Sequence, residues 1–402
     1  MSGRSVLVLG RGASGCAAGK LARELGFRVF VCDDSAPLPP RDECAPGFAV
    51  VSPGLALSHP LLAECRARGI PLRSELEFGC EELKRRGWKL LAVTGSKGKS
   101  SVVKLCAQAL GGVPCGNYGL PVCEVAGDRK IAQSNASPWA VVEVSSFMME
   151  TTELDPDTFE AAAILNLQED HLDRHGSVEV YHALKRKLLT MTRHPVEGAE
   201  VDDSVRSLVR GSYFDNEVLR GNAAAAVALL RAAGLDDVRI RRAFTGFEPL
   251  PHRMNLVAEL DGVRYIDDSK ATSLSALAAG VMMASSGNRP TGQSASRRIL
   301  LVAGGLPKGD EPKNALPVLT ERVKKVYLIG QCAEVFFAAW KSWVDCEICG
   351  TMEKAVESIR REAEKGETVL LSPGTASFDQ FKSFGERGDV FASLVKKERK
   401  DE

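Results

Sequence analysis

The sequence Leu90-Leu91-Ala92-Val93-Thr94-Gly95-Ser96-Lys97-Gly98-Lys99-Ser100-Ser101 decides the fold. Its apolar start predicts a buried strand, its glycines predict a tight turn, and Lys99 and Ser100 open an amphipathic helix that continues through Leu110. Gly95 and Gly98 let the backbone point successive N–H groups inward, and the helix adds its positive N-terminal end. The stretch therefore predicts a phosphate-binding loop, in which Lys99 reaches the β/γ-phosphates and Ser100 ligates Mg²⁺.

The loop departs from the complete Walker pattern at one position. A glycine would stand where Val93 stands, so the motif is the shorter Gly-x-x-Gly-Lys-Ser form. The alternative is an ordinary strand-to-helix turn with a surface lysine. The order of strand, turn and helix favours the phosphate loop.

Length and composition limit the class of protein. The 402 residues are too many for one core and predict two or three domains. Lys+Arg and Asp+Glu number 52 each, so charge indicates neither nucleic acid nor an anionic membrane as the main partner. Because the chain has no run of eighteen apolar residues and no signal-like start, we expect a cytoplasmic enzyme of small molecules without membrane insertion.

The eleven cysteines are scattered along the chain, which suits reduced thiols better than a disulfide framework. Cys346 and Cys349 form the only close pair. A zinc or redox site would need a second pair or a helix start after it, and neither is visible in the sequence.

A second glycine motif lies near the start of the chain. The apolar run Val6–Leu9 leads into Gly10-Arg11-Gly12-Ala13-Ser14-Gly15, a helix, and a strand Arg28–Cys32 that ends at Asp33. This βαβ pattern offers N–H groups to a diphosphate and an acid to a ribose, so a nucleotide sugar and a dinucleotide fit equally well. Alone, the motif would favour an NAD enzyme. A glycine turn without a ligand is the remaining alternative.

Polar side chains follow later strands. Glu143 interrupts the apolar strand 140–144 near its carboxyl end, where a carboxylate can hold Mg²⁺. Another strand leads into residues 168–175, whose density of acids and histidines indicates a metal or phosphate site. Lys185 lies on the predicted helix Val178–Met191. By spacing alone, that lysine would be solvated.

The last part of the chain repeats this arrangement. Predicted strands end in segments with Ser, Thr, Lys and Asp, the residue types that bind phosphate, ribose and carboxylate groups. These segments are 267–272, 304–310 and 372–381. Residues 285–298 lack periodicity and predict a loop insertion.

The alternation of strands and helices predicts an α/β protein with three domains. We expect a Rossmann-like domain at 1–88, a central P-loop ATPase-type parallel sheet at 89–250, and a C-terminal Rossmann-like α/β domain at 251–402.

Together the motifs resemble the Mur ligase family, the ATP-dependent amino-acid ligases of peptidoglycan synthesis. The similarity runs from Val6 to about Leu394, and its motifs are Thr94–Ser101, Gly116–Gly119, Glu143–Phe147, Asn166–Arg174, Asp268–Thr272 and Ser372–Lys382. The first is shared with folylpolyglutamate synthetases. The last two, with Ser52-Pro53-Gly54, are typical of the branch that adds D-glutamate.

The resemblance implies that the first domain binds a UDP-sugar, the second binds ATP and the third closes over the site. ATP would phosphorylate the alanyl carboxylate of UDP-MurNAc-L-Ala, and the amine of D-glutamate would attack the acyl phosphate. A carboxylate is a poor electrophile because it is anionic, and phosphorylation supplies a leaving group. The resemblance also implies two Mg²⁺ ions, and we expect a monomer.

The family's functional positions carry over onto this sequence. The implied catalytic residues are Lys99, Asn117, Ser145, His171 and Lys185. Nucleotide contacts would come from Gly95, Ser96, Lys97, Gly98, Lys99, Ser100, Ser101, Asn222, Arg253 and Asp268. Ser100 and Glu143 would hold the first Mg²⁺, and His171 would hold the second with Lys185, which would carry CO₂ as a carbamate. The UDP moiety would contact Gly12, Ala13, Ser14 and Asp33. The remaining substrate contacts would be Lys270, Thr272, Lys308, Ser377 and Phe384, where a cation and hydroxyls suit the two carboxylates of D-glutamate.

Three positions depart from the family pattern. Met148 stands where glutamine is common, Leu219 stands where an asparagine often precedes Asn222, and Asp34-Ser35 replace the usual Thr-Arg. The segment between Lys185 and Asn222 is also far shorter than in typical members of the family, which shortens the central domain between 190 and 215, so we expect a trimmed sheet edge and an intact site.

Other functions remain open. A sister Mur ligase or a folylpolyglutamate-type ligase would use the same phosphate loop, and a degenerate paralogue would bind nucleotide without catalysis. An NAD-linked oxidoreductase would leave residues 94–101 and Glu143 without a role.

Overall fold

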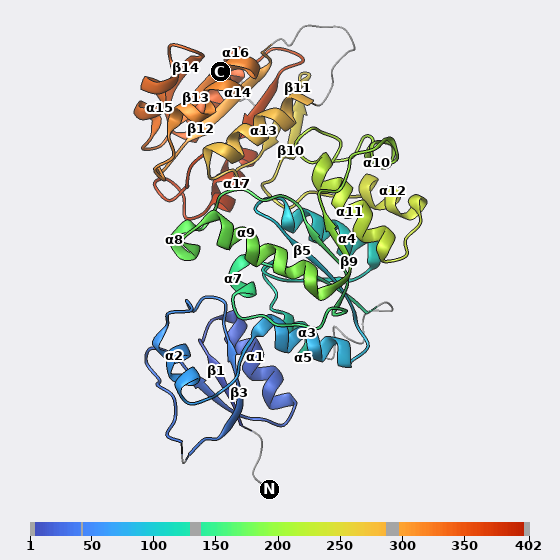
Figure 1. Ribbon diagram of the computed structural model, residues 1–402. Helices are drawn as coiled ribbons and strands as arrows, with labels where there is room; N and C mark the ends of the chain where they lie inside the picture. Colours follow the sequence, from blue (N-terminus) through green and yellow to red (C-terminus); the bar gives the residue numbers. More distant parts are fainter. Residues whose placement is uncertain (1–4, 42, 129–137, 287–296, 398–402) are drawn as a thin grey trace. The chain divides into compact units, whose positions relative to one another are not determined.

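The computed structural model describes residues 5–41, 43–128, 138–286 and 297–397. Helices alternate with the strands of three sheets (Figure 1). The chain forms two compact units. The first comprises Met1–Asp215 with Leu219–Phe247 and holds two sheets, and the second comprises Asn216–Val218 with Glu248–Glu402 and holds the third. The predicted α/β class with parallel sheets is confirmed.

The first sheet is parallel throughout, in the order β2-β1-β3-β4. Its elements are β1 (Ser5–Leu9), α1 (Ala13–Glu24), β2 (Arg28–Cys32), β3 (Pro46–Val51), α2 (Pro60–Ala67), β4 (Leu72–Ser74) and α3 (Glu75–Arg85). Alternate residues of β1 serve two cores, because Val6 packs with α1 and Leu7 packs with α2. Helices α1 and α2 therefore cover opposite faces (Figure 1).

The central sheet is also parallel, in the order β6-β7-β5-β8-β9. Its strands are β5 (Lys89–Thr94), β6 (Val113–Gly116), β7 (Trp139–Glu143), β8 (Phe159–Ile164) and β9 (Thr192–Glu197). Its helices are α4 (Lys99–Leu110), α5 (Val122–Gly127), α7 (Ser146–Met149), α8 (Leu172–His175), α9 (Val178–Lys187), α10 (Asp203–Val209), α11 (Arg220–Ala232) and α12 (Asp237–Thr245). The phosphate loop leaves β5, the middle strand.

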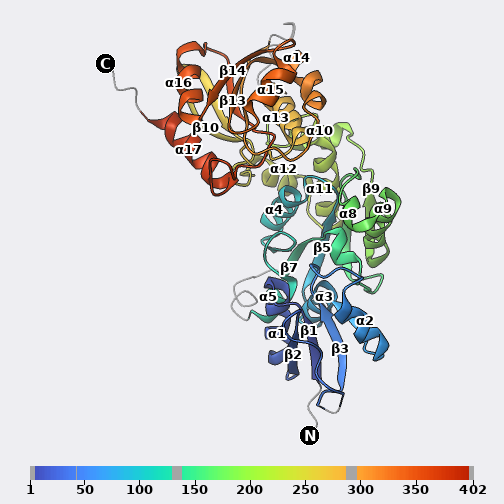
Figure 2. The same cartoon turned by 90° about the vertical axis from the view of Figure 1, so that its left-hand side faces the viewer.

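The first two sheets share one hydrophobic core. Val6 of β1 and Leu90 of β5 belong to the same buried cluster. Helices α3 and α5 pack together where the two sheets meet (Figure 2). The chain therefore passes from the first sheet to the central sheet near residue 88 without a break in the hydrophobic core.

The third sheet has the order β10-β11-β15-β12-β13-β14, and only the pair β10 and β11 is antiparallel. Its strands are β10 (Asn255–Leu260), β11 (Val263–Asp267), β12 (Ile299–Gly304), β13 (Val323–Ile329), β14 (Asp345–Gly350) and β15 (Thr368–Leu371). Its helices are α13 (Leu274–Ser286), η2 (Pro312–Ala315), α14 (Leu316–Arg322), α15 (Ala333–Trp340), α16 (Met352–Glu362) and α17 (Phe384–Lys396). One face is covered by α13, α14 and α15, and the other by α16 and α17.

One predicted helix is shorter than expected. The helix predicted over Val178–Met191 ends at Lys187, and a 3₁₀ turn over Leu188–Met191 (η1) leads into β9, a strand that was not predicted.

Cys346 and Cys349 lie in β14 and contact the cores on opposite faces of the sheet, so they do not converge on a ligand. Most of the predicted loop insertion, residues 287–296, lies outside the described residues.

Candidate active site

The phosphate loop has the backbone that its glycines predict. Gly95 and Gly98 have φ values of 145° and 85°, and α4 begins directly at Lys99. Such positive φ angles favour glycine. The Lys99 ammonium is half-buried and donates to the carbonyl oxygens of Gly95 at 2.8 Å and Ser96 at 3.0 Å. The lysine therefore lies over its own loop, at the N-terminal end of a helix that attracts anions.

Two asparagines hold this loop from outside. The Asn166 Oδ1 accepts from the Lys97 amide at 2.8 Å, and its Nδ2 donates to the Lys97 carbonyl at 2.9 Å and to Asn222 Oδ1 at 3.3 Å. A Cβ atom at Gly98 would lie 2.1 Å from Asn222 Nδ2. Gly98 therefore has to be glycine for two reasons, its φ angle and this close approach. Asn166, which lies two residues after the end of β8, was assigned no role from the sequence.

Glu143 ends β7 with a buried side chain. Its Oε1 accepts from Asn117 Nδ2 at 2.8 Å, while its Oε2 is buried and has no hydrogen-bond partner among the described residues. A buried anionic oxygen without a partner is costly, and a cation would satisfy it. The residues therefore fit the predicted Mg²⁺. No three His, Cys, Asp or Glu side chains of the described chain gather into a metal cage, and a Mg²⁺ bound to phosphates needs only one or two carboxylates from the protein.

Lys185 is 2% exposed, so the prediction from spacing alone, a solvated lysine, is wrong. Its Nζ donates to the Gly95 carbonyl at 3.0 Å and lies 4.6 Å from the centre of the Tyr181 ring. Burial, with a smaller contribution from the nearby Lys99 charge, lowers the pKa of Lys185 to about 7. A lysine with this pKa is partly a neutral amine, which is the form that reacts with CO₂.

His171 adopts a φ of 54° at the start of α8, an unusual conformation for a residue with a Cβ. Its ring is 4.9 Å from Phe147 and 6.2 Å from Tyr181. Because the Tyr181 ring also contacts Lys185, the two predicted ligands of the second metal are linked through one aromatic side chain. Tyr181, whose hydroxyl lies 3.1 Å from Ser96 Oγ, was not predicted.

Met148 and Leu219, two of the departures from the family pattern, are both buried. Met148 is buried in the core shared by the first two sheets, so it offers the site no polar group. Ser145 is the N-cap of α7, where its Oγ accepts from the Met148 amide at 3.3 Å. Leu219 is buried at the N-cap position of α11, and the helix presents Asn222 in its first turn.

The first glycine motif forms a close turn. A Cβ atom at Gly15 would lie 1.9 Å from the Gly10 carbonyl oxygen, so helix α1 packs tightly against the end of β1. Gly12 is the N-cap of α1, and Ala13 and Ser14 are its first two residues. Ser52, which belongs to the Ser52-Pro53-Gly54 motif but was assigned no role in the site, has a buried Oγ without a partner among the described residues, and this oxygen would lie 2.9 Å from a Cβ atom at Gly10.

Asp33 directly follows β2, as predicted, and it is an anion with several partners. Ser35 donates to it through its hydroxyl at 2.7 Å and its amide at 3.0 Å, and Arg11 Nε lies 2.6 Å from Oδ2. The hydrogen bond from Ser35 is the main cause that lowers the pKa of Asp33. Arg11, from the glycine turn itself, therefore brings a cation beside the predicted UDP contact.

In the second unit, Asp268 follows β11 and is buried. Its Oδ2 accepts from the Ser372 hydroxyl at 2.9 Å, and burial raises its pKa to about 7. Gly280 of α13 permits this arrangement, since a Cβ atom there would lie 2.6 Å from the same oxygen. Two of the predicted strand ends, those of β11 and β15, thus meet through one hydrogen bond.

Cations gather in the same unit. The Lys270 ammonium lies 3.8 Å from the centre of the Phe384 ring, and burial lowers its pKa with further contributions from Arg253 and Lys308. Four residues predicted to bind substrate or nucleotide are therefore neighbours: Arg253, Lys270, Lys308 and Phe384. Thr272 is half-buried and Ser377 is buried on the loop after β15. Their hydroxyl groups complete the predicted set for a substrate with two carboxylates.

Arg387 of α17 is a buried cation that the sequence analysis did not single out. It is completely buried and donates to Ser269 Oγ at 2.9 Å, to the Ser269 carbonyl at 2.9 Å, and to the Thr375 and Ala376 carbonyls at 3.2 and 3.3 Å. Burial lowers its pKa to about 10. Arg387 thus fixes the loop that carries Ser377.

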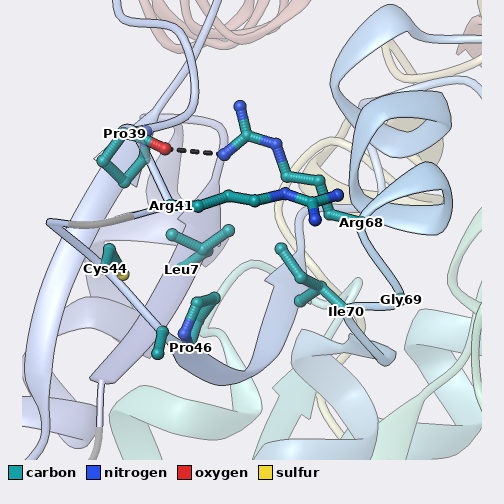
Figure 3. Close-up of a pocket in the computed structure, with 9 residues that line it drawn as sticks. Leu7, Pro39, Arg41, Cys44, Pro46, Arg68, Gly69 and Ile70 are labelled. Atoms are coloured by element: carbon teal, nitrogen blue, oxygen red, sulfur yellow. Dashed lines mark hydrogen bonds between the residues drawn. The ribbon is translucent and has the colours of Figure 1, made fainter.

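A separate cavity of about 290 Å³ opens beside the first sheet (Figure 3). Leu7, Cys44, Pro46 and Ile70 give it an apolar lining, and Arg41 and Arg68 lie at its rim. None of the predicted site residues lines it.

Both units thus contain predicted residues in contact. In the first, the phosphate loop meets Asn222 and Lys185, and Asn117 meets Glu143. In the second, Lys270 meets Phe384 near Arg253 and Lys308. None of the described helices combines the length and apolar character that crossing a membrane requires.

Two family models match the parts of the chain that contain these two groups of predicted residues. The model described as the Mur ligase middle domain matches residues 93–212, and the one described as "Mur ligase, glutamate ligase domain" matches residues 252–374. The matches contain the phosphate loop, Glu143, His171 and Lys185, and Asp268, Lys270 and Lys308, respectively.

Curated relatives match nearly the whole chain. A UDP-N-acetylmuramoylalanine--D-glutamate ligase of Chlamydia abortus is 32% identical, with 98% of each chain covered. The protein of that name from Nitratidesulfovibrio vulgaris is 34% identical, with 98% of this chain and 96% of the relative covered.

Solved structures agree on the fold. The UDP-N-acetylmuramate-alanine ligase MurC of Thermotoga maritima aligns with a TM-score of 0.57 at 16% identity, over 98% of this chain and 99% of that one. MurF of Acinetobacter baumannii aligns with a TM-score of 0.58 at 15% identity, over 80% of each chain. At these identities the likeness concerns the fold alone.

Proposed function

The chain belongs to the Mur ligase family, whose members are ATP-dependent amide ligases, and from this premise we propose that it joins D-glutamate to UDP-N-acetylmuramoyl-L-alanine. One observation carries the proposal: the phosphate loop, with Lys99 and Lys185 on the same carbonyl, shares the central sheet with Glu143, whose buried Oε2 has no partner among the described residues. This is a site for several anions and a cation. The names of the relatives supply the substrates.

The reaction proceeds in two steps. A carboxylate oxygen of the alanyl group attacks the terminal phosphorus of ATP, ADP leaves, and an acyl phosphate forms. The amine of D-glutamate then attacks the carbonyl carbon, phosphate leaves with the carboxylate oxygen, and the amine releases a proton. The chemistry needs charge neutralisation on phosphate oxygens above all.

Residues of the first unit divide this work. Lys99 and the loop amides hold the transferred phosphoryl group, and Gly95, Ser96, Lys97, Gly98 and Ser101 shape the cradle. Ser100 and Glu143 would hold one Mg²⁺, and His171 with Lys185 as a carbamate would hold a second. When bound, these ions offset the negative charge of the phosphates. Asn117 donates a hydrogen bond to Glu143, and Ser145 follows Glu143 by two residues; both would contact the reacting carboxylate. Asn222 would contact the nucleotide.

The buried amine of Lys185 supports the carbamate. With a pKa of about 7, a large part of the lysine is uncharged at neutral pH, and its nitrogen can add to CO₂. The product is an anion in place of a cation, beside Lys99. That change converts a repulsion between two lysines into an attraction.

The two remaining sheets supply the other substrates. Gly12, Ala13, Ser14 and Asp33 would contact the UDP moiety of the sugar, in the sheet that we assign to residues 1–88. In residues 251–402, Arg253 and Asp268 would contact the nucleotide. Lys270, Thr272, Lys308, Ser377 and Phe384 would bind D-glutamate. Since ATP and the UDP-sugar are metabolites of the cytoplasm, we place the reaction there, in the synthesis of peptidoglycan precursors.

The test is a panel of amino acids. The purified protein is incubated with UDP-MurNAc-L-Ala, ATP and Mg²⁺, and D-glutamate, L-glutamate, meso-diaminopimelate or L-lysine is added. The amide product is then identified by mass spectrometry. The proposal predicts a product with D-glutamate and none with the other three. A product with another amino acid would make the protein a sister ligase, and ATP binding without any product would make it a degenerate paralogue.

A further inference from the structure

Arg174 forms the most extensive side-chain network near the predicted metal loop. It lies in α8, three residues after His171. Its Nε and Nη2 donate to the two oxygens of Glu150 at 2.9 and 2.6 Å. The side chains of Arg174 and Glu150 are 16% and 6% exposed. This is a bidentate, largely desolvated ion pair.

The same guanidinium extends to the first sheet. It donates to three successive main-chain carbonyl oxygens, those of Pro53 at 3.2 Å, Gly54 at 3.4 Å and Leu55 at 2.8 Å. These residues follow the end of β3 and directly follow Ser52, whose buried Oγ has no partner among the described residues. Arg174 is therefore a direct link between the central domain and the loop at the carboxyl end of the first sheet.

Aromatic and imidazole side chains near the central sheet complete the network around Arg174. The guanidinium carbon lies 4.4 Å from the centre of the Phe147 ring, which in turn packs 4.9 Å from the His171 ring. His175 contacts Ser146 Oγ at 3.0 Å and Glu150 Oε1 at 3.4 Å. Movement of Arg174 would therefore disturb both His171 and the turn that begins α7 after Glu143.

We propose that Arg174 is a positioning residue that couples binding of the UDP-sugar to binding of the metal-nucleotide. This inference rests on the proposed function. A ligand that orders the Ser52–Leu55 loop also fixes Arg174, and Arg174 fixes the helix that begins at His171. By linkage, a nucleotide that orders the His171 loop strengthens binding of the sugar by the same factor.

Arginine is suited to this role. Its planar guanidinium carries five N–H donors on three nitrogens, which together reach the two carboxylate oxygens and the three carbonyls. The two N–H groups of Nη2 are shared among three of these acceptors, Glu150 Oε2 and the carbonyls of Pro53 and Leu55. Lysine supplies three donors from one point and can satisfy only part of the set. Glutamine lacks the charge for Glu150. Arg174→Lys should therefore keep part of the coupling, and Arg174→Gln should lose it.

The experiment compares the wild type with Arg174→Lys, Arg174→Gln and a matched control, Arg86→Gln. Arg86 forms an ion pair with Glu82 whose side chains are similarly buried, 21% and 5% exposed, on a helix end remote from these loops. Binding of UDP-MurNAc-L-Ala is measured calorimetrically without nucleotide and with a non-hydrolysable ATP analogue and Mg²⁺. Thermal denaturation reports the stability of each variant.

The expected coupling in the wild type is about tenfold, within the range typical of linked sites. It should fall to about one in Arg174→Gln, lie between these values in Arg174→Lys, and stay unchanged in Arg86→Gln. In turnover, the KM for the UDP-sugar should rise in Arg174→Gln, while affinity for the analogue alone should not change. Glu150→Gln, which keeps the carbonyl contacts, provides a second variant should Arg174→Gln fold poorly, and it should show partial coupling.

Three results would overturn the inference. If Arg174→Gln loses stability to the same extent as Arg86→Gln and keeps the wild-type coupling, Arg174 is a structural ion pair only. A wild type that ligates D-glutamate without any coupling rejects the inference and leaves the proposed function intact. A wild type that binds no UDP-MurNAc-L-Ala rejects both.

Discussion

Lys99 and Lys185 donate to the same carbonyl oxygen, that of Gly95, at 2.8 and 3.0 Å. Burial, and to a smaller extent repulsion by the Lys99 ammonium, lowers the pKa of Lys185 to about 7. The loop thus pairs a permanent cation with an amine that can become neutral. The proposed division of labour between phosphate binding and carbamate formation follows from this pair.

Replacement of Lys99 by alanine should nearly abolish turnover without unfolding the protein. The half-buried lysine donates to the carbonyl oxygens of Gly95 and Ser96 in the loop, so its loss removes charge from the phosphate site and little packing. We expect kcat to fall by about 10²–10³-fold or more, as for the loss of a group that stabilises transition-state charge. ADP release and circular dichroism measure the two effects. Undiminished ADP release would refute the role of the loop.

Activity should depend on CO₂ through Lys185, and the pH dependence has a definite sign. Since the lysine loses its proton at a pKa of about 7, the neutral amine increases as the pH rises through that value. In buffer depleted of CO₂, the rate should fall and bicarbonate should restore it, more completely at about pH 8 than at about pH 6. Lys185→Gln should be slow and insensitive to bicarbonate. A Lys185→Gln protein of wild-type rate would contradict the carbamate, and sodium chloride at equal ionic strength is the control for salt.

Glu143→Gln should weaken the response to Mg²⁺. The amide can still accept the hydrogen bond from Asn117, but it cannot offer the anionic Oε2 that is buried without a partner. We expect the Mg²⁺ concentration for half-maximal rate to rise about tenfold or more. Glu82→Gln removes another buried carboxylate, one already paired with Arg85 and Arg86, and should leave the Mg²⁺ response unchanged. An unchanged response in Glu143→Gln would exclude Glu143 as a ligand.

Lys308→Ala should raise the KM for D-glutamate. The lysine lies near Lys270 and Arg253, and it is the exposed member of this group. Loss of one charged hydrogen bond to a carboxylate typically costs about 1.5–3 kcal/mol, or about tenfold to a hundredfold in KM. Lys313→Ala, in the short helix η2, is the control and should keep the wild-type KM. If both variants behave alike, the amino acid binds elsewhere.

Glu75 should make stability depend on pH. It is 1% exposed at the start of α3, its Oε1 accepts from the Cys123 amide at 2.7 Å, and burial raises its pKa from the ordinary value of 4.5 to about 7. A raised carboxyl pKa contributes stability that is fully present below about pH 4.5 and is lost as the pH rises to about 7. The difference in unfolding free energy between wild type and Glu75→Gln should therefore change over this window, by about 3 kcal/mol at most. Parallel curves from urea denaturation would contradict the assignment.

Strong local patterns made much of the fold predictable. The glycine turns at Gly10–Gly15 and Gly95–Gly98 and the apolar strands before them identified the middle of both sheets in the first unit. The edge strands β9 and β10 were missed because most of their side chains are exposed or only partly buried, and β9 contains Pro195. Such strands lack the apolar run that marks a buried strand.

Side-chain networks were less predictable than strand ends. Glu143 and Asp268 were identifiable because the first ends an apolar strand and the second directly follows one. Arg174, Asn166 and Arg387 act through partners that are far away in sequence, such as Pro53, Lys97 and Ser269, and no local period reports those contacts. The burial of Lys185 was likewise invisible to spacing. It depends on Gly95 and Tyr181, which only the fold brings together.

The transfer of one oxygen atom tests the central claim most directly. UDP-MurNAc-L-Ala labelled with ¹⁸O in both alanyl carboxylate oxygens is incubated with ATP, Mg²⁺ and D-glutamate, and the released phosphate is examined by mass spectrometry. The proposed acyl phosphate predicts one labelled oxygen in each phosphate formed with an amide. Unlabelled phosphate alongside amide formation would contradict phosphoryl transfer to the carboxylate, and the absence of both products would contradict the ligase assignment itself.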